Sequence, residues 1–150
     1  MSLQRWARLM PGLWAGWLLC AGLLATPAPF ALLARAEAGR VVSRMLAQEA
    51  YTSLALGIVL LIVERVIARR RVDHHAGSQF STEMVLVLGT LLCTVLGYFA
   101  VQPMMDAARA GAGPLGFGAL HAISSTFYVV KVLLVVALAW RRASPVNAPA

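Results

Sequence analysis

Four long apolar runs constrain the fold of this chain more than any other feature of its sequence. They cover about residues 10–34, 48–68, 80–102 and 116–140. A helix of about 20 apolar residues crosses a hydrocarbon core of about 30 Å, and a helix satisfies its own backbone hydrogen bonds in lipid. The sequence therefore predicts an all-α polytopic integral membrane protein. We expect a four-helix transmembrane bundle over residues 1–142 and a disordered tail at 143–150.

The composition supports a lipid-facing chain. Of the 150 residues, 60% are hydrophobic and 13% are charged, whereas a soluble domain is nearer half apolar and about a quarter charged. The net charge of +7 could indicate nucleic-acid binding. The arginines, however, stand at the ends of the apolar runs and form no basic domain, which excludes that class. This placement is typical of a protein whose partner is a bilayer with anionic headgroups.

The first apolar run could be a signal peptide, because Arg5 and Arg8 precede it and a small-x-small step occurs at 34–36. A signal peptide has an apolar core of about 7–15 residues, and this run exceeds 20. We therefore predict a retained first helix. The segment 34–50 that follows has apolar residues at helical spacing between arginines. It predicts either a short helix on the outer surface or an extension of the second spanning helix.

The distribution of arginine predicts the orientation. One side of the predicted topology carries eight arginines: Arg5, Arg8, Arg65, Arg69, Arg70, Arg71, Arg141 and Arg142. The other side carries four: Arg35, Arg40, Arg44 and Arg109. Since positive residues accumulate in the cytoplasm, we expect both termini there.

Each predicted helix carries its polar or small residues on one face. The fourth helix has His121, Ser124, Ser125, Tyr128 and Lys131; the third has Glu83, Thr90, Thr94 and Gly97; the second has Glu49, Ser53, Gly57 and Glu64; the first has Gly12, Gly16 and Cys20. We expect these faces to meet at the centre of the bundle, with Gly12 and Gly16 allowing another helix to approach closely.

Lys131 is the most informative of these residues, because a charge in mid-bilayer is costly and usually has a partner or borders water. The predicted depths place Lys131 in the cytoplasmic half with Glu83 and Glu64, and Glu49 with His121 and Asp106 in the outer half. A buried pair of Lys131 with Glu83 or Glu64 is one interpretation. A proton or solute path lined by Lys131, Glu83, Tyr128 and His121 is a second, and snorkelling of Lys131 to the headgroups is a third.

Other chemistry is sparse. His121, Cys20 and Cys93 are the weak metal-ligand candidates within the spans, and they form no recognised spacing. We expect no cofactor and no catalytic residues, and hence no enzyme.

Four short motifs resemble a known family. They are Trp14-Ala15-Gly16, the turn Pro27-Ala28-Pro29-Phe30, the step Ala38-Gly39-Arg40, and the segment from Phe117 to Ser124. Together they resemble the domain of unknown function 4149 proteins, a group related to transmembrane protein 205. Pro29 departs from the family pattern and bears on where the first helix ends. The resemblance implies four helices in a bacterial inner membrane and no established reaction.

The sequence thus predicts a non-enzymatic inner-membrane protein, either a small transporter-like unit or a subunit of a membrane complex. Because four helices enclose little volume, a homo-oligomer is a natural way to build a path. The alternative function is metal or haem handling through His121, since the chain also distantly resembles the copper-resistance D type of four-helix membrane protein.

Overall fold

The computed structural model describes residues 3–73 and 80–144, and within them it contains helices and turns but no strand. The helical elements are α1 (Leu3–Cys20), η1 (Ala21–Ala25), α2 (Pro27–Leu32), α3 (Arg35–Asp73), α4 (Thr82–Thr94), η2 (Val95–Ala100), α5 (Val101–Arg109) and α6 (Phe117–Ala143). The elements η1 and η2 are π-helical turns. Of the tail predicted at 143–150, Ala143 ends α6, and residues 145–150 lie outside the described part of the chain.

These elements form four rods that are long and apolar enough to span a membrane: Leu3–Leu32, Arg35–Arg70, Thr82–Arg109 and Phe117–Ala143. This confirms the four predicted helices, although their bounds differ from those of the apolar runs. The first rod continues through Pro27 and Pro29 to Leu32. Residues 35–50 form the beginning of α3, so the predicted extension of the second helix is confirmed and the separate surface helix is wrong.

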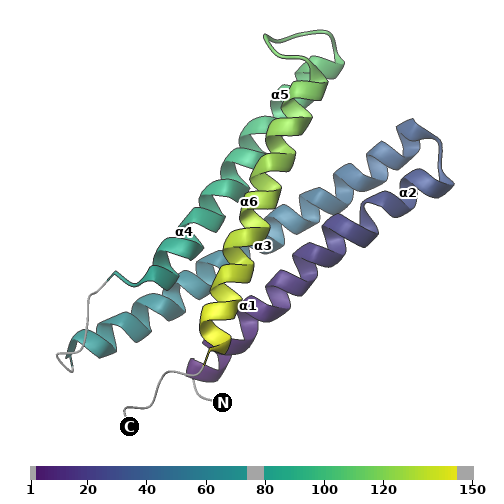
Figure 1. Ribbon diagram of the computed structural model, residues 1–150. Coiled ribbons are helices and arrows are strands. Elements are labelled where there is room, and N and C mark those ends of the chain that lie inside the picture. The colour runs from purple at the N-terminus through teal and green to yellow at the C-terminus, as the bar shows by residue number, and fades with distance from the viewer. Residues whose placement is uncertain (1–2, 74–79, 145–150) are drawn as a thin grey trace.

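The four rods pack as two antiparallel hairpins, α1–α3 and α4–α6. The helix α6 lies between α1 and α4, and α3 packs against the same two helices from the other side. Figure 1 shows that the hairpins come together where α1 begins and α6 ends, and diverge toward α2 and α5. We call the first of these the closed end and the second the open end.

The closed half contains the principal apolar core. All four rods contribute to a cluster of fully or nearly fully buried residues: Trp14, Ala15, Leu18, Leu60, Val87, Val135 and Leu138. In the open half a smaller cluster of Val101, Met105 and Leu120 joins α5 to α6 within one hairpin. The hairpins are therefore held together mainly by their closed halves.

The π-helical turns lie on two sides of α6, at the level where the hairpins separate. A Cβ added to Gly22 in η1 would lie 2.9 Å from the Tyr128 ring, and one added to Gly97 in η2 would lie 2.5 Å from the Phe127 Cβ. The missing side chains therefore allow both turns to approach α6 closely. Such turns are often found at functional sites of helical proteins.

The prediction that Gly12 and Gly16 form a packing face is wrong. Both are exposed, and a Cβ added to either would meet nothing within 4 Å. The packed face of α1 is formed by larger residues on the other side of the helix, Ala7, Pro11, Trp14, Ala15 and Leu18. A small-x-x-x-small spacing shows where a close approach could occur, and the neighbouring helices here use other positions.

Candidate functional site

A cavity of about 260 Å³ lies between the hairpins in the open half. All four rods line it. The lining residues follow Leu18 in the first rod and are Leu46 and Glu49 in the second. They run onward from Cys93 in the third rod and up to Lys131 in the fourth. Every one of these segments leads from mid-height toward the open end, whereas the apolar core occupies the same four rods toward the closed end. The cavity therefore takes the place of the core in the open half.

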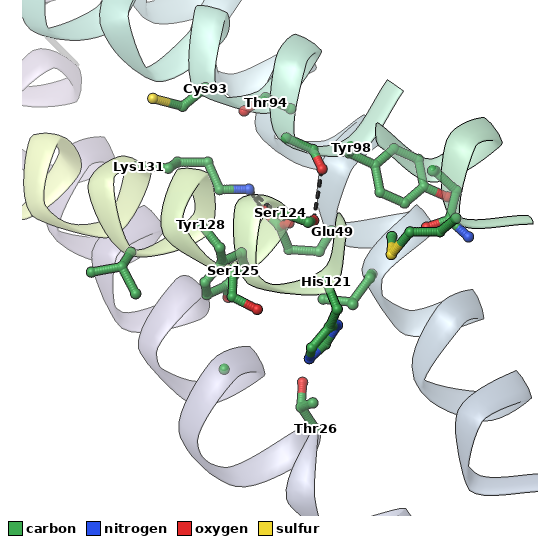
Figure 2. A pocket seen from close by; sticks show the side chains of 16 residues that line it. Thr26, Glu49, Cys93, Thr94, Tyr98, His121, Ser124, Ser125, Tyr128 and Lys131 are labelled. Carbon is green, nitrogen blue, oxygen red and sulfur yellow. Dashed lines mark hydrogen bonds and ion pairs between the residues drawn. The ribbon is translucent and has the colours of Figure 1, made fainter. Parts of the chain in front are cut away.

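The floor of the cavity is an ion pair between α3 and α6. The Lys131 Nζ donates to both carboxylate oxygens of Glu49, Oε1 and Oε2, at 2.8 Å each. Each side chain is only 4% exposed. Figure 2 shows Lys131 extending from α6 to the carboxylate, with His121 and Thr26 farther along the cavity. The pair therefore marks the boundary between the cavity and the core.

Two further side chains hold the carboxylate from the side of the core. The Ser53 hydroxyl, one turn along α3, donates to Glu49 Oε1, and it accepts a hydrogen bond of 3.1 Å from the Trp14 indole Nε1 on α1. Both Ser53 and Trp14 are buried. Charged groups in a bilayer are tolerated when such bonds replace water, and this chain fixes Glu49 independently of Lys131.

The predicted partners of Lys131, Glu83 and Glu64, are corrected by the structure. Glu64 pairs with Arg142, and Glu83 accepts hydrogen bonds from Arg141 at 3.1 and 3.2 Å. These two arginines lie about 15 Å beyond Lys131 along α6, at about 1.5 Å per residue. The prediction used the depth of the Lys131 backbone in the membrane and not the depth of its side-chain nitrogen. Side chains on a helix lean toward its N-terminus, so Lys131 reaches toward the open end and Glu49.

Tyr128 lines the same cavity and makes two further contacts there. The Lys131 Nζ lies 4.8 Å from the centre of the Tyr128 ring, within the range of a cation–π interaction. The Tyr128 hydroxyl crosses to the first rod and donates to the Leu18 carbonyl at 2.8 Å. On the other side of α6, the Ser124 hydroxyl donates to the Gly97 carbonyl in η2 at 2.7 Å. The first bond joins α6 to α1 just before η1, and the second joins α6 to η2.

His121 lies nearer the mouth of the cavity and away from the ion pair. Its side chain is exposed and stacks on the Phe117 ring at 5.9 Å between centres. The Arg109 guanidinium covers the same ring at 4.6 Å and pairs with Asp106 at 2.7 Å. Of the residues named for the predicted path, Lys131, Tyr128 and His121 line one cavity, whereas Glu83 lies at the closed end with Arg141.

The three weak metal-ligand candidates, His121, Cys20 and Cys93, do not form a cluster. Among the described residues, no group of three or more His, Cys, Asp or Glu side chains could hold a metal ion. Cys20 is exposed on α1, and Cys93 is buried on α4, where it lines the cavity. No observation on the described residues supports the metal- or haem-handling alternative.

Sequence reasoning missed the π-helical turns, and it missed two residues of the first rod that line the cavity, Gly22 and Thr26. The hydrogen-bond register of the turns depends on contacts with α6, and the sequence carries no clear signal for it. The link from Ser53 to Glu49 had a usable signal, because residues four apart share a helix face. The link from Ser53 to Trp14 spans 39 residues and had none.

Comparison with known proteins places the chain by family alone. No curated protein and no solved structure matches it. A family model described as "Domain of unknown function (DUF4149)" matches residues 9–114. The match covers more than half of the chain, from α1 through α5 to the loop that precedes α6. It includes Glu49, whereas Lys131 and the Phe117–Ser124 motif lie beyond it. The chain therefore belongs to the DUF4149 family.

Proposed function

We propose that this protein is a small transporter-like unit of the bacterial inner membrane, which admits a small polar solute to the cavity between its hairpins. One observation carries the proposal: the cavity ends at the Glu49–Lys131 pair. Ionisable residues inside a membrane are costly, and they commonly mark a solute or ion path. A pair with a purely structural role has no need of a cavity that leads to it.

The two sides of the pair differ in a way that suits solute binding. Toward the closed end it rests on the apolar core, and toward the open end it borders a cavity large enough for several waters or a small molecule. This is the arrangement of a carrier that is open on one side. Passage through the membrane would require the closed halves to separate, and the apolar packing there makes them the gate.

We also propose that the chain is not an enzyme. The Tyr128 and Ser124 hydroxyls donate to backbone carbonyls, so neither is arranged as a nucleophile beside a general base. A role as a subunit of a larger membrane assembly, or as a homo-oligomer, remains compatible with a solute site of this kind. Co-purification from native membranes distinguishes a separate unit from a subunit.

The proposed orientation follows from arginine. The eight arginines of one predicted side belong to the closed end, and the four of the other side to the open end. By the positive-inside rule the closed end is cytoplasmic, and the cavity faces the periplasm. Reporter fusions after Arg71 and Ala143 should report cytoplasm, and one after Arg109 should report periplasm. The reverse pattern would turn the cavity to the cytoplasm.

Thiol labelling tests the cavity directly. In a chain with Cys20→Ser and Cys93→Ala, a single Ser125→Cys should react with a membrane-impermeant maleimide applied to the periplasmic side, because Ser125 lines the cavity. The matched control on the same helix is Val135→Cys, which lies in the core and should not react. Equal protection of both positions in folded protein would contradict the proposal.

A further inference from the structure

Six hydroxyl groups line the cavity, and most of them offer it an acceptor rather than a donor. Four of them give their protons to backbone carbonyls: Thr26 to Ala21, Thr94 to Thr90, Ser124 to Gly97 and Tyr128 to Leu18. A hydroxyl that donates in this way keeps its oxygen lone pairs for a ligand. Glu49, which is the one carboxylate among the described residues that line the cavity, is likewise an acceptor. Such a lining is suited to a ligand that donates hydrogen bonds or carries positive charge.

The site already holds an ammonium group, which is that of Lys131. Its nitrogen is 2.8 Å from both oxygens of Glu49 and 4.8 Å from the centre of the Tyr128 ring. A carboxylate beside an aromatic face is a common arrangement for recognising ammonium ions. The arrangement does not depend on Lys131, because Ser53 and Trp14 hold Glu49 from the other side.

We propose that the cavity takes a small monovalent cation, with primary ammonium ions preferred, which replaces the Lys131 ammonium at Glu49 in exchange for one proton. This proposal rests on the proposed function and names its solute class. Lys131 is then a tethered competitor that occupies the site when no solute is bound.

The exchange is balanced in charge. The incoming cation pairs with the Glu49 carboxylate, one N–H bond of the Lys131 ammonium breaks, and the electron pair stays on the nitrogen. The proton passes to a water molecule in the cavity and leaves with it. The site holds one positive and one negative charge before and after. A divalent cation would leave an uncompensated charge in a low-dielectric site, which is unfavourable.

Several other titratable groups surround this exchange. Those near the Lys131 ammonium are Glu49 from α3, Cys93 from α4 and Tyr128 from α6. Cys20 of α1 interacts with Tyr128. Tyr98 and His121 line the cavity farther from the ammonium. Since the solute competes with a proton for the site, the apparent affinity should rise as the pH rises.

The test uses the full chain in detergent, in weakly buffered solution with a pH indicator, titrated with methylammonium chloride. We expect a saturable release of one proton for each cation bound. Glu49→Gln should weaken binding by at least about tenfold, because it removes the charge that pairs with the cation. Potassium chloride should release protons at higher concentrations, and methylammonium acetate should behave as the chloride does.

Lys131→Arg is the decisive variant, because arginine keeps the pair with Glu49 but does not give up its proton. It should fold and melt like the native chain, yet release no protons and bind methylammonium at least about tenfold more weakly. Arg141→Gln is the matched control on the same helix, since Arg141 is half exposed at the closed end; its proton release should be unchanged.

Proton release that persists in Lys131→Arg, or that follows the anion rather than the cation, would overturn the inference. Absence of release from the native chain would do so as well. If Ser125→Cys is labelled while no cation releases protons, the cavity remains a solute site and only its cation chemistry is wrong. If Ser125→Cys is protected, the proposed function itself is wrong.

Discussion

The closed and open halves of this bundle are built from the same four rods, yet they differ in what fills the space between the hairpins. In the closed half, Trp14, Leu60, Val87 and Leu138 meet in an apolar core to which every rod contributes. In the open half the hairpins diverge (Figure 1), and a cavity lined by both polar and apolar residues lies between them. The halves meet at Glu49 and Lys131. Dense packing in one half provides the rigid support that a cavity in the other half requires.

The difference shows how a small membrane protein can hold a polar site. A bilayer offers little hydrophobic drive for helices to associate, so packing and hydrogen bonds must hold them together. The closed half supplies packing between the hairpins. In the open half, Tyr128 and Ser124 connect α6 by hydrogen bonds to the first and third rods. Each half can therefore be disturbed separately, and the expected effects differ in size.

The largest effect is expected at the boundary between the halves. Lys131→Met strands the buried Glu49 carboxylate and should destabilise the protein by about 3–5 kcal/mol. The double variant Lys131→Met/Glu49→Gln should recover most of that loss, because neither charge remains. Thermal unfolding of the single and double variants in detergent measures the coupling. The double variant Lys131→Met/Glu83→Gln is the control and should show additive losses, since Glu83 pairs with Arg141.

The second prediction compares the two apolar clusters. Leu138→Ala in the closed half, at 0% exposure, should cost about 2–5 kcal/mol through the cavity it leaves. Leu120→Ala, at 2% exposure in the smaller open-half cluster, should cost less because its surroundings can collapse more easily. Leu133→Ala on the same helix, at 62% exposure, is the lipid-facing control. Equal losses at Leu138 and Leu120 would remove the contrast between the halves.

The third prediction concerns close approach in the open half. Gly97→Ala places a Cβ 2.5 Å from that of Phe127 and should destabilise the protein by about 1–3 kcal/mol. Gly16→Ala adds a methyl group into open space and should be neutral or stabilising by up to about 1 kcal/mol, because alanine favours helix over glycine. Unfolding of both variants under one condition tests the assignment of packing glycines, and a larger loss at Gly16 would reverse it.

The smallest effect is expected at the surface of the closed end. Arg141→Gln breaks the pair with Glu83, in which the arginine is about half exposed. A pair of this kind contributes at most about 1 kcal/mol, so the melting temperature should change little. The contrast with Lys131→Met is the informative quantity, because both variants remove a cation from α6. A loss as large as that of Lys131→Met would mean that the closed end depends on its charges.

The sequence predicted much of the fold and part of the site. The structure contains the four predicted spans and the predicted extension of the second helix to residues before 48. It also has a polar face on α6 that contains Tyr128 and Lys131. The partner of Lys131 and the role of Gly12 and Gly16 were predicted wrongly. The first error came from assigning depth by backbone position alone, and the second from a spacing that many unpacked helices share.

Local properties of the chain determined how many helices it forms. In lipid each backbone group must be satisfied within its own helix, so apolar length alone predicts a span, and polar residues inside a span must face protein or water. Only the tertiary structure decided that Lys131 meets Glu49, that Gly22 and Gly97 approach α6, and that a cavity replaces the core in the open half. Those outcomes depend on the direction, tilt and register of helices whose contacts join residues far apart in sequence, and no local pattern encodes them.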